Sequence, residues 1–177
     1  MVDAVVREVR PEDSAEISAL HARAFGPGRY ARTAYRIREG KGAFSRYCRV
    51  CLIDGRIIAA VRFTPITIGG KDGALLLGPL AVDPALKNAG IGSALMRHAV
   101  TEAARLGHGA ILLVGDAPYY GRFGFSAAKT GALAMPGPYE RHRLLALELT
   151  DGALDGAQGT LRAAGRKLKA LPLTFAA

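Results

Sequence analysis

The stretch Leu77-Gly78-Pro79-Leu80-Ala81-Val82-Asp83-Pro84-Ala85-Leu86-Lys87-Asn88-Ala89-Gly90-Ile91-Gly92-Ser93-Ala94-Leu95 joins an expected strand to an expected helix through a glycine-containing loop. The residues from Ala74 to Val82 are almost continuously apolar, which is typical of a central strand buried on both faces. The residues from Ile91 to Leu106 have the apolar spacing of an amphipathic helix. A loop that opens a helix presents backbone N–H groups and the positive end of the helix dipole, so it can bind a phosphate.

Two common phosphate-binding motifs do not fit this loop. A Rossmann fingerprint needs a small residue three positions after Gly92, and that residue is Leu95. A Walker loop needs Gly-Lys followed by Ser or Thr, whereas Gly40-Lys41 is followed by Gly and Gly70-Lys71 by Asp. Taken alone, the loop is equally compatible with a turn that binds nothing.

Strands and helices alternate on both sides of this segment. The dipeptide Asp54-Gly55 predicts a tight hairpin, because both of its positions need a positive φ, and Pro65 predicts a bulge or an edge. The order predicts an α/β or α+β sheet whose parallel βαβ core consists of the Ala74 strand, a crossover helix and the Ala110 strand. We expect further strands at residues 5–10, 46–53, 56–68, 110–114 and 143–149, and helices at residues 11–25, 30–39, 91–106 and 118–122.

The helix over residues 91–106 is expected to bury one face. Its helical spacing places Arg97, Glu102 and Arg105 towards solvent. The residues expected on the buried face are Ile91, Ala94, Leu95, His98 and Ala99.

Cys48 and Cys51 are the only two cysteines, and their Cys-x-x-Cys spacing is compatible with a redox or zinc site. They fall in a segment expected to be a strand, where residues three apart point to opposite faces. We therefore expect two reduced thiols, one of them in the core, and no metal site.

The composition is that of a globular chain. Its 177 residues are 50% hydrophobic and 22% charged, which favours one domain, expected over residues 1–150. The Gly- and Ala-rich residues 151–177 are expected as a C-terminal extension, packed on the domain or partly frayed.

The N-terminus carries Asp3 where a signal peptide has basic residues, and no apolar run is long enough to span a membrane, so a cytoplasmic protein is expected. The formal net charge of +9 favours an anionic partner, such as a phosphorylated cofactor, a nucleic acid or an anionic membrane surface.

A second motif follows the next expected strand. In Gly115-Asp116-Ala117-Pro118-Tyr119-Tyr120-Gly121-Arg122-Phe123-Gly124-Phe125, Tyr120 precedes a Gly-Phe pair by four residues. The segment from Lys87 to Gly92 matches the pattern Gln/Arg-x-x-Gly-x-Gly/Ala, with Lys in the first place. Together the two motifs resemble those of the GNAT superfamily of acyl-CoA-dependent N-acetyltransferases. The residues of the second motif are similar to those of a bacterial subgroup of this superfamily.

The chain departs from the family pattern at two places. Lys87 keeps a positive charge but lacks the planar guanidinium of Arg. Asp116-Ala117-Pro118 stands where many members carry an Asn. The resemblance covers the chain from Val5 to about Thr150.

The resemblance implies a mixed, mostly antiparallel twisted sheet of about six to seven strands, with acetyl-CoA bound where the two parallel strands separate. A backbone N–H of Leu80 or Val82 is expected to stabilise the oxyanion, and Tyr120 to protonate the leaving thiolate. The residues expected to bind the cofactor are Leu80, Ala81, Val82, Lys87, Asn88, Ala89, Gly90, Ile91, Gly92, Ser93, Ala94, Asp116, Tyr120 and Phe123.

The acceptor is expected to be a primary amine, on a small molecule or a peptide, that attacks acetyl-CoA directly in a ternary complex. A protonated amine must first lose a proton, so the site needs a base or a water chain that leads to one. The sequence does not choose among the carboxylates of Asp83, Asp116, Glu12, Glu16 and Glu39. The four histidines form no ligand cluster.

Two other functions stay open. A catalytically idle member of the superfamily would sense acyl-CoA without turnover. A nucleic-acid-binding module would account for the charge, but the basic residues are scattered apart from Arg166-Lys167-Leu168-Lys169, and no strand is rich in base-stacking aromatics. These two features argue against a nucleic-acid partner. No membrane partner is expected, and the sequence leaves a homodimer open.

Overall fold

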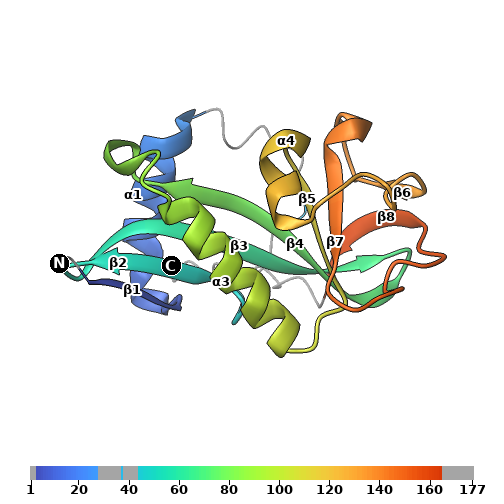
Figure 1. Cartoon of the computed structure of the whole chain (residues 1–177), viewed down its shortest axis with the longest axis horizontal. Coiled ribbons are helices and arrows are strands. Elements are labelled where there is room, and N and C mark those ends of the chain that lie inside the picture. The colour runs from blue at the N-terminus through green and yellow to red at the C-terminus, as the bar shows by residue number, and fades with distance from the viewer. Residues whose placement is uncertain (1–2, 28–36, 38–43, 165–177) are drawn as a thin grey trace, which may run out of the picture.

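Two long strands, β3 (Arg56–Ile68) and β4 (Lys71–Val82), form the centre of the sheet (Figure 1). The computed structural model describes residues 3–27, 37 and 44–164. Within these residues the strand order is β1-β2-β3-β4-β5-β7, and β8 pairs with both β3 and β6. The other strands are β1 (Ala4–Glu8), β2 (Arg49–Ile53), β5 (Ala110–Val114), β6 (Leu133–Ala134), β7 (Leu144–Glu148) and β8 (Gly159–Ala163).

The predicted parallel βαβ unit is confirmed. Helix α3 (Ile91–Arg105) connects β4 to β5, and these strands pair in parallel from Ala74 with Ala110 to Leu76 with Leu112. The mixed, mostly antiparallel sheet is confirmed as well. The described residues contain eight strands, more than expected, because β6 has only two residues and β8 lies beyond Thr150 in a Gly- and Ala-rich stretch without a strand pattern.

The predicted hairpin between β2 and β3 is also confirmed. Asp54 has a φ of 49° and Gly55 a φ of 76°, so both turn residues adopt the left-handed conformation that the dipeptide predicted. Pro65 lies where β3 changes its neighbour, because β2 pairs with β3 up to Val61 and β8 pairs with it from Ile66. The carbonyl of Pro65 accepts a hydrogen bond from the N–H of Ala164 at 2.9 Å, so this end of the pairing with β8 uses the carbonyl and does not need the N–H that proline lacks.

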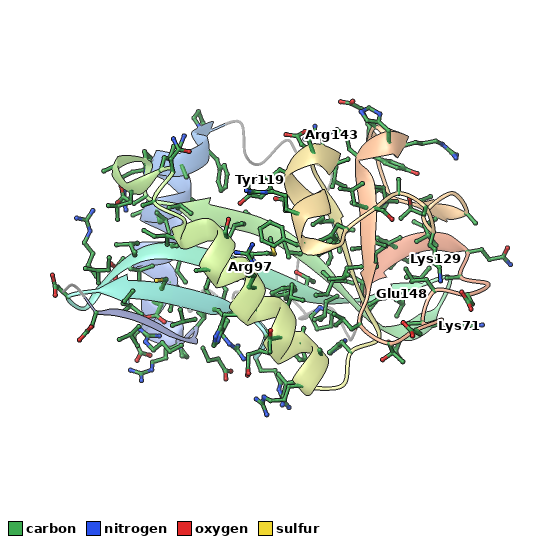
Figure 2. All side chains as sticks on the ribbon, viewed as in Figure 1. Lys71, Arg97, Tyr119, Lys129, Arg143 and Glu148 are labelled. Atoms are coloured by element: carbon green, nitrogen blue, oxygen red, sulfur yellow. The ribbon has the colours of Figure 1, made fainter. Side chains whose placement is uncertain are left out.

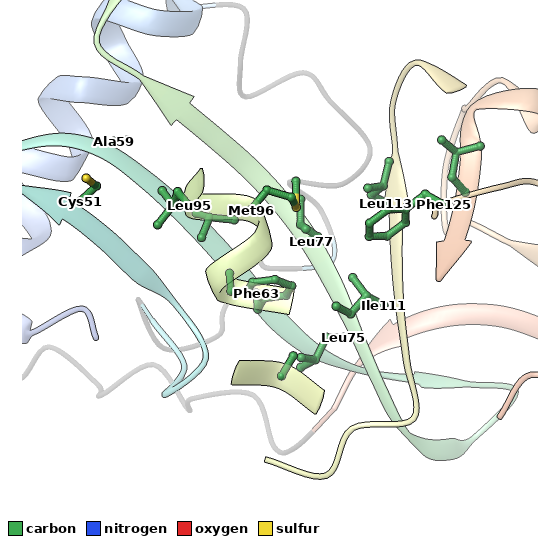
Figure 3. Close-up of a cluster of buried hydrophobic side chains, with 14 of the residues drawn as sticks. Cys51, Ala59, Phe63, Leu75, Leu77, Leu95, Met96, Ile111, Leu113 and Phe125 are labelled. Atoms are coloured by element: carbon green, nitrogen blue, oxygen red, sulfur yellow. The ribbon is translucent and has the colours of Figure 1, made fainter. Parts of the chain in front are cut away.

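Helix α3 packs on one face of the sheet over a continuous apolar cluster (Figure 3). Leu95, Met96 and Ala99 are buried in this cluster, whereas Ala94 and His98 are exposed. The expected buried face was therefore rotated by about one residue, and the prediction for Ala94 and His98 was wrong. Leu95 and Met96 both reach the core because the helix lies over a broad, twisted sheet, which accommodates a wider apolar stripe.

Helix α1 (Ser14–Phe25), which was expected within residues 11–25, covers the opposite face of the sheet. Ile17 and Leu20 are buried against Val50, Ile57 and Ala60 of the sheet. The helix expected from Tyr30 to Glu39 falls outside the described residues, apart from Ile37, which is buried. No helix in the described part of the chain is long and apolar enough to cross a membrane.

Both cysteines are buried and free, so the expectation of a single core thiol was wrong. Strand β2 begins at Arg49, and Cys48 lies in the turn before it, so strict strand alternation does not apply to the pair. The backbone N–H of Phe63 donates to Cys48 Sγ at 3.4 Å, and burial raises the pKa of the Cys51 thiol. Burial and a raised pKa are properties of unreactive structural thiols. Among the described residues no group of His, Cys, Asp and Glu could hold a metal ion.

Residues beyond Thr150 continue into the sheet. β8 pairs antiparallel with β3, from Ile66 with Ala163 to Ile68 with Leu161, and both Leu154 and Leu161 are buried. Lys129 and Glu148, labelled in Figure 2, form an ion pair of 2.9 Å at this end of the molecule. This hydrogen bond is the main reason why the pKa of Glu148 lies below its ordinary value. Strand pairing and apolar packing hold the described part of the C-terminal segment on the domain.

Truncation of Leu161 tests how much β8 contributes to the fold. Leu161→Ala should lower the free energy of unfolding by about 2–5 kcal/mol, because it removes a fully buried side chain and leaves a cavity. Urea unfolding followed by circular dichroism measures this change. The neighbouring Arg162→Ala, on an exposed side chain, is the matched control and should change the unfolding free energy by less than about 0.5 kcal/mol.

Candidate functional site

The site begins where β4 and β5 separate. Their parallel pairing ends at Leu76 and Leu112, although β4 continues along β3 as far as Val82. Leu77 faces Phe63 and Leu80 faces Val61, so β4 carries two residues, Gly78 and Pro79, opposite one residue of β3. Such a bulge bends a strand and increases its twist. Figure 3 shows the end of β4 turning away from β5 beyond this point.

The backbone of β4 beyond the bulge has a defined orientation. The N–H of Asp83 donates to the carbonyl of Ile58 on β3 at 2.8 Å. Backbone N–H groups alternate in direction along a strand, so Ala81 also points towards β3, whereas Leu80 and Val82 point away from it. The N–H groups of Leu80 and Val82 therefore face the side from which β5 has separated.

The loop after β4 places the N-terminus of α3 beside this end of β4. Asp83 caps a short 3₁₀ turn by accepting a hydrogen bond from Ala85 N–H at 3.0 Å. Gly90 has a φ of 78° and caps α3, and the N–H of Ala94 bonds to its carbonyl at 3.0 Å. The N–H groups of the preceding turn have no carbonyl within the helix to bond. They form a cluster of donors at the positive end of a fifteen-residue helix.

Gly92 lies at the tightest point of this turn. A Cβ at this position would be 3.2 Å from Val82 Cγ2 and 3.7 Å from the hydroxyl oxygen of Tyr119. The first of these distances is shorter than an ordinary van der Waals contact. The absence of a side chain therefore keeps the surface of the turn open between β4 and α4 (Ala117–Tyr120).

These elements enclose a cleft with a volume of about 520 Å³. It brings together ten of the residues expected to bind a cofactor: Leu80, Ala81, Val82, Lys87, Asn88, Gly90, Ile91, Gly92, Ser93 and Tyr120. Five further residues of its wall were not among the expected cofactor-binding residues: Ala24, Phe25, Leu86, Tyr119 and Arg122. Ala24 and Phe25 are the last two residues of α1. This helix is distant in sequence from the other residues of the wall, so no local motif could have predicted its contribution.

Four expected cofactor-binding residues do not line the cleft. Ala89 and Ala94 are exposed, and Asp116 points its carboxylate to Arg143, with 3.2 Å between Oδ1 and Nη2. Phe123 does not line the cleft, and its ring centroid lies 5.2 Å from the guanidinium carbon of Arg97 and 5.5 Å from that of Arg122. Geometry therefore gives no support to a cofactor contact from these four side chains.

Two adjacent tyrosines of α4 reach the cleft. Tyr120 is half-buried, with its ring centroid 6.1 Å from that of Phe125, and it lies so close to Gly115 that a Cβ there would overlap its ring. Tyr119 is more exposed, and its ring stands nearly perpendicular to that of Tyr120, at 84° and 4.9 Å between centroids. The motif pointed to one tyrosine, and the fold presents both.

The carboxylates considered as bases form hydrogen bonds or ion pairs outside the cleft, or do not belong to the described residues that line it. Asp83 Oδ2 lies 3.1 Å from an Arg56 nitrogen and 3.5 Å from one of Arg23, and Glu16 accepts a bond from the backbone N–H of Ile57 at 2.7 Å. Glu12 and Asp116 are exposed and do not line the cleft, and Glu39 lies outside the described residues. Among the described residues of the wall, the ionisable groups are Lys87, Arg122 and the two tyrosines, so this part of the cleft is positively charged.

Three kinds of comparison agree with this geometry. The model of an acetyltransferase (GNAT) domain matches residues 45–127. The N-acetyltransferase YhbS of Escherichia coli K12 is 29% identical over 157 residues, which cover 88% of this chain and 93% of YhbS. The crystal structure of E. coli YhbS in complex with CoA superposes with a TM-score of 0.79 and 28% identity, covering 93% of this chain and 91% of that one. A GNAT acetyltransferase from Brucella melitensis in complex with acetyl-CoA gives a TM-score of 0.71 at 28% identity, covering 93% and 97%.

The diverging parallel strands β4 and β5 and the helix α3 that connects them form the GNAT fold, which the CoA-bound structure of YhbS shares. Residues 45–127 therefore form a GNAT acetyltransferase domain, as the resemblance of the two motifs predicted.

Proposed function

We propose that this protein transfers the acetyl group of acetyl-CoA to a primary amine of a small molecule or peptide, by direct attack in a ternary complex. The proposal rests on one observation. The loop that opens α3, the two residues of β4 whose N–H groups point away from β3, and Tyr120 all line the same cleft. The relatives whose structures contain CoA or acetyl-CoA support the same donor.

The loop and α3 fit the diphosphate of the donor. N–H groups at a helix start bind phosphate oxygens, and Gly92 leaves the space that a side chain would occupy. Lys87 lines the cleft and adds a positive charge. The carboxylates of Asp83 and Asp116, which would repel an anion, are paired with arginines and do not line the wall.

The outward N–H groups of Leu80 and Val82 fit the thioester. A backbone N–H aimed at the carbonyl oxygen would stabilise the negative charge that develops when the amine attacks. The bulge at Gly78 and Pro79 supports this role, because it separates β4 from β5 and leaves the outer edge of β4 accessible.

Tyr120 fits the role of general acid. When the tetrahedral intermediate collapses, the leaving thiolate takes a proton, and a phenol with an ordinary pKa of about 10 can supply it. The ring of Tyr120 is fixed by Phe125 and by the close contact with Gly115, so this residue is held at the wall of the cleft.

A ligand titration followed by an acceptor screen tests the proposed function. Acetyl-CoA should raise the melting temperature, because a ligand that binds only the folded state stabilises it by mass action. Release of free CoA thiol is then measured across amines, polyamines, amino acids and peptides. Binding without thiol release on any acceptor would favour an acyl-CoA sensor. RNA or DNA affinity that falls steeply with salt, without any response to CoA, would favour a nucleic-acid-binding module.

Asp83 is expected to support the loop without acting as the base. Asp83→Asn removes both arginine pairs but keeps an oxygen for the Ala85 N–H, so we expect a loss of about 1–3 kcal/mol in unfolding free energy. Turnover should fall less than tenfold, whereas loss of a general base costs about 100- to 10,000-fold. Turnover measured below the melting temperature, with denaturant unfolding alongside, separates the two roles. A loss of turnover in the larger range would identify Asp83 as the base.

A further inference from the structure

Tyr119 and Arg122 line the cleft but lie outside the set of residues that the motifs assigned to the cofactor. Figure 2 shows Tyr119 extending from α4 into the space between α4 and the N-terminal end of α3. Its hydroxyl oxygen lies 3.7 Å from the position that a Cβ of Gly92 would occupy. The phenol therefore lies on the α4 side of the cleft, close to the first turn of α3.

Arg122 is held beside this phenol by two interactions. Its Nε–H donates to the carbonyl of Tyr119 at 3.2 Å, and its guanidinium carbon lies 4.5 Å from the centroid of the Tyr119 ring. A guanidinium stacked on an aromatic face keeps the N–H groups of its outer edge available for hydrogen bonds in its own plane. The arrangement fixes the charge of Arg122 at the wall of the cleft before any ligand arrives.

We infer that Tyr119 and Arg122 form a second wall of the diphosphate site, opposite the loop from Lys87 to Gly92. The Tyr119 hydroxyl and the outer guanidinium N–H groups donate hydrogen bonds to diphosphate oxygens that the loop N–H groups do not reach. The inference rests on the proposed function, and it assigns a different role to each of the two adjacent tyrosines. Tyr119 binds the donor, and Tyr120 supplies the proton.

Calorimetric titration of two variants with three ligands tests this second wall. Arg122→Gln and Tyr119→Phe are compared with Arg141→Gln, which removes an equal charge from an exposed position that does not line the cleft. The ligands are acetyl-CoA, acetyl-3′-dephospho-CoA, which keeps the diphosphate, and S-acetylpantetheine, which has no phosphate.

Both ligands that carry the diphosphate should bind Arg122→Gln about 10- to 100-fold more weakly, and Tyr119→Phe about 10-fold more weakly, because hydrogen bonds to a charged group are lost. The affinity for S-acetylpantetheine and all affinities of Arg141→Gln should stay at the wild-type value. In steady-state assays the loss should appear in the KM for acetyl-CoA far more than in kcat.

Three results would overturn the second wall. Unchanged acetyl-CoA affinity would show that the two side chains make no contact, and an equal loss for S-acetylpantetheine would show a general distortion of the cleft. A loss confined to acetyl-CoA would move the contact to the 3′-phosphate. A wild-type protein that binds none of the ligands would contradict the proposed function itself, so the two failures are distinguishable.

Discussion

Tyr120→Phe should lower turnover by about 100- to 10,000-fold while acetyl-CoA affinity stays close to the wild-type value. The substitution removes only the hydroxyl, so the ring that packs against Phe125 and Gly115 is retained. Without a proton donor the thiolate leaves far more slowly, and a positioned acid contributes a factor of this size. Thiol-release kinetics and calorimetry on the same preparation give both quantities.

Tyr139→Phe is the matched control for this experiment. Its hydroxyl donates to the carbonyl of Leu133 at 3.2 Å, away from the cleft wall, so the loss is one structural hydrogen bond. It should lower the unfolding free energy by about 1 kcal/mol and leave turnover unchanged. Wild-type turnover in Tyr120→Phe would remove this residue from its proposed role and direct attention to Tyr119.

Gly92→Glu should weaken acetyl-CoA binding on the order of 100-fold or more. The new side chain would start 3.2 Å from Val82 Cγ2 and bring bulk and negative charge to the turn that faces the diphosphate. The new Cβ requires a small displacement of Val82 Cγ2. The fold should tolerate it, because Glu is a better helix former than Gly by about 0.5–1 kcal/mol and an acidic residue is favourable in a first turn. Calorimetry should therefore show lost binding in a protein with a nearly unchanged melting temperature.

Gly131→Glu is the control for the introduced charge. Gly131 is exposed and has no atom within 4 Å of the position of a new Cβ, so the same substitution meets no neighbour there. Its acetyl-CoA affinity should stay within about twofold of the wild-type value, as expected for an exposed substitution away from the site. Normal acetyl-CoA affinity in Gly92→Glu would contradict the assignment of the loop to the diphosphate.

Features that depend on neighbouring residues could be predicted from the sequence. The hairpin at Asp54-Gly55 follows from the positive φ of both residues, and the crossover from β4 through α3 to β5 follows from two apolar strands around one amphipathic segment. The motifs around Gly92 and Tyr120 predicted two parts of the cleft, because each motif is a short continuous segment whose residues set its own backbone conformation. These features are local, and each is encoded within a few residues.

Features that depend on distant partners were missed or misplaced. β8 has no strand pattern of its own and forms because β3 offers it an edge beyond Pro65. Ala94 and His98 were expected in the core, but the width of the apolar stripe on α3 is set by the sheet beneath it. Cys48 is buried through its contacts with Phe63, which is fifteen residues away in sequence.

The sequence by itself determined where the glycine-containing loop ends and α3 begins, since glycine positions and helix periodicity are properties of the chain. The tertiary structure decided what that segment faces. The bulge in β4 separates two strands and orients the N–H groups of Leu80 and Val82, and the packing of α4 brings both tyrosines and Arg122 to the same cleft. These relations arise only when segments far apart in the chain pack together, because distances between their side chains are fixed by the folded sheet and not by local backbone preference.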